Sequence, residues 1–468
     1  MKKSELVFIP WPMVGHLVST VEIAKRLIDQ DDRISVTILC IKLWLTPFAD
    51  EFTKSLVGSE TRIKLIDIPE PPSSELLIKT RKDYFYLYAE SLVPQVRNTL
   101  KHIIMSSQSN SIQVSGLVLD FFCMPMLDVA NELGLNSYIF FTCNLGFLSF
   151  FLHLPTCHDL IGSEFKDSDP DLILPGFANP VPVRLIPAHL FTKDGYSLML
   201  KLAQRFRETK GILVNSFVEL ESHDIVESLI SDGKTPPLYM IGPVVDLEGL
   251  PHPSADQAQQ ENIMEWLDEQ PDSSVLFLCF GSVGCFFGAS QLIEIALGLE
   301  RSGYRFLWCA TSQKPFRNVQ EEITFPEGFL ERTKGRGIVC EWAPQVEVLA
   351  HKAVGGFVSH CGWNSILESL WCGVPIATWP IYAEQQLNAF RMVREFGLAV
   401  ELRLDYKYDR DVVMAEEIEM AVKRLMEGES EVRKKGKEMS KMARNAVAKG
   451  GSSFNALGQL IADVVRSM

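Results

Sequence analysis

The densest group of residues that could bind a charged ligand lies in the last third of the chain. An apolar run at 355–358 is typical of a strand, and a helix is expected to begin directly after it, near Gly362. Backbone N–H groups at the start of a helix bind anions, helped by the positive end of the helix dipole. His360 lies at the lip of this helix start, and Asn364 and Ser365 add side-chain donors. The segment therefore predicts a diphosphate site that needs no glycine-rich loop.

Two neighbouring residues could bind a nucleoside. Glu368 follows Asn364 by four positions and Ser365 by three, so it shares their helix face. A carboxylate so close to a diphosphate would be repelled unless a ribose diol donated hydrogen bonds to it, as in dinucleotide sites. Trp342, beside Pro344, offers a flat platform for a base. Taken singly, each residue could be structural, because tryptophan is usually core and Asn or Ser at a helix start usually caps it.

A candidate general base lies far away in the sequence. His16 follows an expected strand at 6–9 and opens an expected helix at 17–28. An unperturbed histidine titrates near about pH 6.5, which suits a base at working pH. Asp120 ends an expected strand at 116–119, and a carboxylate bonded to one imidazole nitrogen would fix the tautomer and stabilise the imidazolium. From spacing alone, simple helix capping explains both residues equally well.

Both groups of residues need a scaffold, and the apolar pattern predicts two domains of the same kind. Strand-like runs alternate with helix-like stretches in the first half, and the alternation restarts after a Pro-, Asp- and Gln-containing stretch at 242–260. Strands are expected at 6–9, 34–40, 63–66, 116–119, 138–141, 275–280, 306–309, 337–340, 355–358 and 375–378, and helices at 17–28, 290–302, 365–370 and 384–395. This rhythm indicates α/β domains with mostly parallel sheets, and two such domains facing each other would enclose a ligand cleft.

The composition limits the classes of partner. The chain has 468 residues, of which 47% are hydrophobic and 22% charged, and its formal net charge at pH 7 is -14. An acidic surface repels nucleic acid and anionic membranes, so neither is an expected partner. The ten cysteines include no C-x-x-C pair and several lie in apolar runs. That usage is typical of reduced thiols in a cytoplasmic protein, not of zinc ligands or a disulfide framework.

Three further patterns could suggest a membrane span, a metal site or an NAD site, but each has a simpler structural explanation. Segment 133–158 carries no formal charge, but a short strand passing into an apolar helix fits it better than a membrane-spanning helix. Asp167, Asp169 and Asp171 alternate like a metal loop, yet Leu172 stands where an EF-hand needs glycine, which favours a solvated acidic loop. No G-x-G-x-x-G follows the first strand, and this argues against an NAD-dependent oxidoreductase.

The 44 residues at 342–385 closely resemble the signature box of the plant family 1 UDP-glycosyltransferases. The matching motifs are W-A-P-Q at 342–345, H-C-G-W-N-S at 360–365, E at 368, G-V-P at 373–375, P at 380 and E-Q at 384–385, with G-H at 15–16 and F-G-S at 280–282 elsewhere. The resemblance implies the GT-B fold of two facing Rossmann-like domains. Its expected parts are an acceptor-binding domain at 1–245, a linker at 246–262, a UDP-sugar-binding domain at 263–450 and a helix at 451–468 that returns to the first domain.

The resemblance also implies a role for each site residue. Those at the nucleoside would be Trp342, which stacks on uracil, Ala343, Gln345 and, on the ribose hydroxyls, Glu368. Those at the diphosphate would be Ser282, His360, Asn364 and Ser365. Those at the sugar would be Thr142, Trp363, Glu384 and Gln385. His16 and Asp120 match the catalytic dyad of the family.

The implied reaction is an inverting transfer. A closing Gln in this family goes with glucose, so the expected donor is UDP-glucose and the products are a β-glucoside and UDP. No metal or cofactor is expected, because donors at a helix start would replace the cation at the leaving group. The chain is expected to act as a monomer. A catalytically silent nucleotide-sugar-binding protein on the same fold is the alternative, and the presence of both His16 and Asp120 weighs against it.

The first domain should supply an apolar acceptor pocket. Met13 and Val14 precede the candidate base, and five aromatic residues cluster after Asp120 and Thr142, namely Phe121, Phe122, Phe147, Phe150 and Phe151. Such a lining suits a small lipophilic acceptor, although any one of these side chains could be core. The nearest resemblance within the family is to the group acting on flavonoids, other phenylpropanoids and some triterpenes. The C-F-F-G-A stretch at 285–289 departs from the usual polar sequence there.

Overall fold

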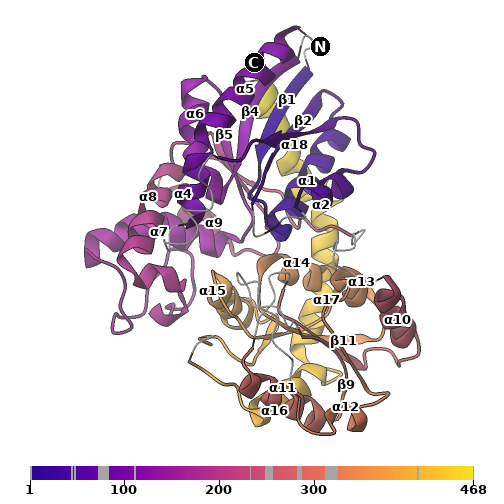
Figure 1. Ribbon diagram of the computed structural model, residues 1–468. Coiled ribbons are helices and arrows are strands. Elements are labelled where there is room, and N and C mark those ends of the chain that lie inside the picture. Colours follow the sequence, from indigo (N-terminus) through magenta and orange to yellow (C-terminus); the bar gives the residue numbers. More distant parts are fainter. Residues whose placement is uncertain are drawn as a thin grey trace.

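A computed structural model describes residues 3–43, 46, 49–71, 84–109, 112–231, 233–247, 257–281, 287–310, 325–407 and 410–466. They form two α/β domains, with the first in indigo to magenta and the second in dark red through orange to yellow in Figure 1. The last helix lies beside the first sheet, and both chain ends meet at the far end of the first domain. The expected pair of facing α/β domains is therefore confirmed.

The first domain is built on a parallel sheet of seven strands in the order β3-β2-β1-β4-β5-β6-β7. The strands are β1 (Lys3–Ile9), β2 (Ile34–Ile41), β3 (Ile63–Ile68), β4 (Ile112–Asp120), β5 (Ser137–Phe141), β6 (Gly211–Val214) and β7 (Leu238–Met240). Its helices are α1 (Val14–Gln30), α2 (Ala49–Val57), α4 (Tyr84–Ser91), α5 (Val93–Ser109), η1 (Phe121–Met126), α6 (Leu127–Glu132), α7 (Leu145–Ile161), η2 (Val183–Leu185), η3 (Ala188–Phe191), α8 (Lys193–Phe206) and α9 (His223–Ser231). Strands covered on both faces are rich in apolar residues along their whole length, as β2 and β5 are.

The second domain repeats this plan with six parallel strands in the order β10-β9-β8-β11-β12-β13. The strands are β8 (Val275–Cys279), β9 (Arg305–Cys309), β10 (Gly337–Cys340), β11 (Val354–Ser359), β12 (Ile376–Thr378) and β13 (Ala399–Glu401). Its helices are α10 (Gln257–Asp268), α11 (Ala289–Ser302), α12 (Phe329–Arg332), α13 (Gln345–Ala350), α14 (Trp363–Cys372), α15 (Gln385–Phe390), η4 (Arg391–Glu395), α16 (Ala415–Met426) and α17 (Glu431–Val447).

The strand order reverses between β1 and β4 in one sheet and between β8 and β11 in the other. At such a switch point the chain leaves two adjacent strands toward opposite faces, which opens a crevice at their carboxyl ends. His16 follows β1 and Asp120 ends β4, while His360 follows β11. The topology alone thus brings the candidate base to one crevice and the candidate diphosphate site to the other.

Helix α18 (Ser452–Arg466) ends the described chain and packs on the first domain. Leu457, Leu460 and Ile461 are buried there with the core of β1 and β2. Polar contacts fix the register, because the Tyr239 hydroxyl donates to Asp463 Oδ2 at 2.9 Å. The chain therefore crosses between the domains twice.

One of two expected segments differs in the structure, and the other divides as expected. Helix α10 begins at Gln257, inside the stretch 246–262 that was expected to be linker. Residues 257–261 are mostly strong helix formers, and Ile263 and Leu267 bury one face of the helix. The helix therefore begins before the end of the expected linker. Segment 133–158 divides into β5 and α7 as expected, and among the described residues no helix is long and apolar enough to cross a membrane.

Candidate active site

The structure places His16 and Asp120 in direct contact. His16 Nδ1 lies 2.7 Å from Asp120 Oδ2, and Asp120 Oδ1 accepts a hydrogen bond from the Phe122 N–H at 2.9 Å. Burial of the imidazole lowers its pKa, but the charge and hydrogen bond of Asp120, with a smaller contribution from Glu384, raise the pKa of His16 above 6.5 overall. With Nδ1 engaged by the carboxylate, Nε2 is the nitrogen available to accept a proton.

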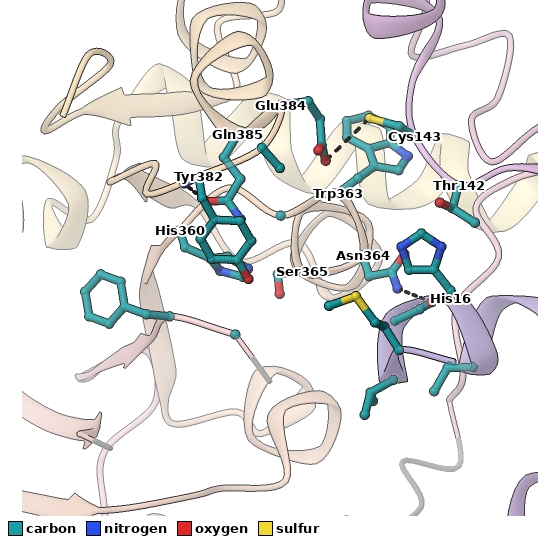
Figure 2. Close-up of a pocket in the computed structure, with 18 of the residues that line it drawn as sticks. His16, Thr142, Cys143, His360, Trp363, Asn364, Ser365, Tyr382, Glu384 and Gln385 are labelled. Carbon is teal, nitrogen blue, oxygen red and sulfur yellow. Dashed lines mark hydrogen bonds between the residues drawn. The ribbon is translucent and has the colours of Figure 1, made fainter. Parts of the chain in front are cut away.

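A cavity of about 710 Å³ opens in front of His16 and is walled by both domains. Figure 2 shows His16 and Thr142 on one side and His360, Ser365, Tyr382 and Gln385 on the other. The expected site residues in its wall are His16, Thr142, Trp342, Ala343, Gln345, His360, Trp363, Asn364, Ser365, Glu368, Glu384 and Gln385. Asp120 stands behind His16, and Ser282 lies outside the described residues.

The start of α14 forms the floor of the expected nucleotide site. Gly362 caps the helix, and Gln345, from the start of α13, donates from Nε2 to Ser365 Oγ at 2.8 Å and to Glu368 Oε2 at 2.6 Å. Burial raises the pKa of Glu368 to about 7, although the Gln345 hydrogen bond opposes the shift. Gln345 therefore orients the carboxylate expected to bind the ribose, a link that the motif alone did not reveal.

His360 lies edge-on between two glycines. A Cβ atom added to Gly281 would lie 2.6 Å from His360 Nε2, and one added to Gly362 would lie 2.5 Å from it. Both positions therefore need glycine, because the ring leaves no room for a side chain. Burial lowers the pKa of His360 to about 4, so the ring is neutral at pH 7. A neutral imidazole can donate one N–H to an anion without bringing a second buried charge.

Two residues of the motif reach across to the first domain. Asn364 Nδ2 donates to the Gly15 carbonyl at 2.8 Å, next to His16, as Figure 2 shows. The indole N–H of Trp363 donates to the Asn215 carbonyl at 2.6 Å, and its side chain is buried. These bonds hold the carboxyl ends of the two sheets together beside His16. The expected contacts of Asn364 with the diphosphate and of Trp363 with the sugar stay predictions.

The two residues that close the motif, Glu384 and Gln385, each accept hydrogen bonds from neighbouring groups. Gln385 Oε1 accepts from the N–H groups of Ile381 and Tyr382, both at 2.9 Å, so its amide nitrogen is the end left for a ligand. Glu384 Oε1 accepts from Cys143 Sγ at 3.8 Å and from Asn388 Nδ2 at 3.4 Å. Burial raises the pKa of Glu384, while nearby His16 and these hydrogen bonds oppose the shift.

The support of Glu384 continues into a buried polar network between the domains. Asn388 Oδ1 accepts from Asn144 Nδ2 at 2.7 Å, and Arg391 Nη1 donates to Asn144 Oδ1 at 3.1 Å. The same Arg391 nitrogen pairs with Glu221 Oε2 at 2.8 Å, and both side chains are at most 2% exposed. Gly146 allows this approach, because a Cβ there would lie 2.4 Å from Arg391 Cδ.

The sequence contains two features that indicate buried polar groups in this network, although the family motif does not include them. Glu384, Asn388 and Arg391 follow one another at spacings of four and three, which places them on one helix face. Asn144 interrupts an uncharged apolar segment, and a buried amide there requires partners. The two observations indicate buried polar groups on both segments, although they do not show that the segments meet.

The apolar end of the cavity corrects the expected acceptor wall. Phe121, Phe122 and Phe147 line it, but Phe150 and Phe151 do not. The turn of α7 points the latter two into the core, where the Phe151 ring lies 4.9 Å from that of Phe206. Other apolar residues of the lining could not be predicted from local sequence patterns, because they come from distant parts of the chain: Phe85, Tyr86, Leu198 and Met199.

Known proteins resemble this chain over its whole length. Residues 236–443 match the family described as UDP-glucoronosyl and UDP-glucosyl transferase. UDP-glycosyltransferase 71K1 from Malus domestica is 55% identical, covering 99% of each chain, and flavonol 3-O-glucosyltransferase UGT71C4 from Arabidopsis thaliana is 47% identical, covering 99% of this chain and 98% of its own. The crystal structure of Medicago truncatula UGT71G1 complexed with UDP-glucose superposes with a TM-score of 0.90 at 52% identity, covering 99% of this chain and 98% of that one.

Proposed function

Because this chain belongs to the plant family 1 UDP-glycosyltransferases, we propose that it transfers glucose from UDP-glucose to a hydroxyl of a small lipophilic acceptor, with inversion to a β-glucoside. The observation that carries the proposal is the His16–Asp120 pair at the mouth of a cavity whose opposite wall holds the donor motif. A base on one domain and a nucleotide-sugar site on the other is the arrangement that a direct displacement needs.

In the proposed step, His16 Nε2 removes the proton of the acceptor hydroxyl. The oxygen attacks the anomeric carbon from the side opposite UDP, the bond from that carbon to the β-phosphate oxygen breaks, and its electron pair leaves with UDP. Asp120, hydrogen-bonded to Nδ1, stabilises the imidazolium that forms. N–H groups at the start of α14 and neutral His360 face the leaving diphosphate, so the proposal assigns charge stabilisation to protein donors and not to a metal.

The proposed acceptors are phenols of flavonoid or other phenylpropanoid type, or terpenoid alcohols. The aromatic side chains of Phe85, Phe122 and Phe147 line the end of the cavity next to His16, where the His16 and Phe122 rings lie 5.8 Å apart. Flat apolar rings stack or pack edge-on against such a wall. A similar relative is named a flavonol 3-O-glucosyltransferase, which supports the phenolic class.

The proposal is tested by incubating the protein with UDP-glucose and a panel of phenols and terpenoid alcohols. We expect release of UDP together with a glucoside of β configuration, measured by chromatography, mass spectrometry and NMR of the anomeric proton. Binding of UDP in calorimetry with no glucoside across the panel would instead favour a silent nucleotide-sugar-binding protein.

Donor choice is expected to depend on Gln385. The Gln385→His variant should use UDP-glucose less well relative to UDP-galactose, because the amide oriented by Ile381 and Tyr382 is replaced by a ring of different reach. The measurement is the ratio of the two products when both donors compete. Gln386→His is the matched control, since that side chain points to the Tyr406 carbonyl instead of the cavity. Equal donor ratios in the Gln385 variant and the parent protein would remove this role.

A further inference from the structure

Three adjacent strands of the second sheet each end in a cysteine. Cys279 ends β8, Cys309 ends β9 and Cys340 ends β10. The register pairs Cys309 with Cys340 directly, and it pairs the residues just before Cys279 and Cys309 with each other. Paired residues of parallel strands project from the same face of the sheet. The three thiols therefore form a row along the carboxyl edge, with Cys309 in the middle.

Cys309 lies between the other two cysteines of this thiol row. Its Sγ lies 3.8 Å from Cys340 Sγ, and the strand register places Cys279 on its other side. A hydrogen bond with the Cys309 thiol lowers the pKa of Cys279, against the opposing effect of burial, and the same interaction raises the pKa of Cys309. Cys279 therefore ionises more easily than Cys309, and Cys309 is in position to react with a sulfenic acid formed on Cys279.

The thiol row is open to the cavity. Cys279 and Cys309 are half-buried and line the cavity, whereas Cys340 is buried two residues before Trp342. Gly281, two residues after Cys279, packs so closely against His360 that even a Cβ atom added there would lie 2.6 Å from the ring. A small oxidant that enters the cavity therefore meets two thiols at the strand ends that position the donor site.

We propose that Cys279, Cys309 and Cys340 form an oxidation-sensitive site in the donor wall, in which peroxide joins Cys279 to Cys309 and thereby weakens donor binding. This proposal goes beyond the proposed transfer. It depends on that transfer in one respect, because it takes the sugar donor to be the molecule that covers the thiols. A disulfide needs its sulfur atoms at about 2.05 Å. Neighbouring strands already lie about 4.8 Å apart, within the Cα range of a disulfide, so closure requires the two side chains to turn toward each other at the strand ends. We expect this turn to shift the chain that leads to Gly281, which has no free space beside His360.

The chemistry balances with hydrogen peroxide as the oxidant. The Cys279 thiolate attacks one peroxide oxygen, the O–O bond breaks, and a sulfenic acid and hydroxide form. The Cys309 sulfur then attacks the sulfenic sulfur while its proton passes to the departing hydroxyl group, so the S–S bond forms, the S–O bond breaks and water leaves. Two thiols have lost two electrons and two protons, and the peroxide has become two molecules of water.

The test treats the reduced full-length protein with a small excess of peroxide, alkylates the remaining thiols and maps the peptides by mass spectrometry. We expect loss of two hydrogen atoms in mass, a disulfide on Cys309, and loss of UDP binding in calorimetry that dithiothreitol reverses. Saturating UDP-glucose should slow the oxidation several-fold. In Cys309→Ser no disulfide should form at this site, and Cys279 should become trappable by dimedone as a sulfenic acid.

Cys372→Ser is the matched control, because that half-buried thiol lies outside the cavity wall and should leave the oxidation unchanged. A bond from Cys309 to Cys340 instead of Cys279 would overturn the proposed pairing. Alkylation of all three thiols after peroxide treatment, or equal and reversible loss of UDP binding in Cys309→Ser, would overturn the proposal. Neither the mapping of the disulfide nor the measurement of UDP binding needs an acceptor. The oxidation test therefore remains valid if the protein fails to transfer glucose.

Discussion

Replacing His16 by alanine should lower glucosyl transfer by about 10² to 10⁴-fold, the usual contribution of a positioned base, while UDP still binds. The imidazole is the group whose free nitrogen faces the cavity, and its partner Asp120 already holds the other nitrogen. Turnover at saturating donor and acceptor measures the loss, and calorimetry with UDP measures retained binding. Residual activity should be greatest on phenols, which ionise more easily than aliphatic alcohols.

The control for this prediction is His102→Ala, which replaces an exposed histidine on α5 and should change neither turnover nor UDP binding.

The pH dependence of the reaction gives a second test of the role of His16. Because the pKa of His16 is raised, kcat/KM should fall on acidification with an apparent pKa above 6.5, where the base becomes protonated. In Asp120→Asn this acid limb should move to lower pH and the rate should drop. A His16→Ala protein with normal turnover would show that another group is the base.

Replacing Arg391 by alanine should lower the free energy of unfolding by about 3–5 kcal/mol, because it leaves the Glu221 carboxylate buried and unpaired. The guanidinium pairs with Glu221 at 2.8 Å, donates to Asn144 and stacks over the Phe396 ring at 4.5 Å, with almost no exposure. Urea unfolding followed by tryptophan fluorescence measures the change. The variant should also bind UDP-glucose less well, because Asn144 and Asn388 orient Glu384 through this network.

Arg394→Ala is a matched control for the Arg391 variant. It lies one turn further on and pairs with Glu401 at 2.6 Å, but both side chains are about half exposed. Exposed pairs contribute only about 0–1 kcal/mol, so this variant should unfold nearly as the parent does. A double variant Arg391→Met, Glu221→Gln should recover part of the loss, since no isolated charge stays buried. Similar losses for Arg391→Ala and Arg394→Ala would contradict a role for burial.

The parts of the site that could be predicted from sequence are those fixed by local rules. The apolar pattern places His16 and Asp120 at the ends of expected strands, and only the resemblance to the family pairs them. The helix start at Gly362 follows from the apolar pattern before it. A 44-residue motif also identifies the donor wall, because its residues lie on elements close together in sequence.

The rest depends on contacts between distant segments. Phe150 and Phe151 carry the same side chain as Phe147, and only the packing of α7 on Phe206 decides that they face the core. Arg391 and Asn144 meet across the cleft, and neither element predicts the other's position. The same holds for the bond from Trp363 to Asn215, which turns a residue of the donor motif toward the opposite domain.

The return of α18 to the first sheet has a consequence for recombining these enzymes. A chimera made by joining the first 245 residues of one relative to the remainder of another would place a foreign α18 against the core of β1 and β2. Leu457, Leu460 and Ile461 fill that core, and Asp463 accepts from the Tyr239 hydroxyl. The structural unit that can be exchanged is therefore discontinuous: the first half of the chain together with its last helix. Acceptor specificity should transplant cleanly only when both pieces come from the same parent.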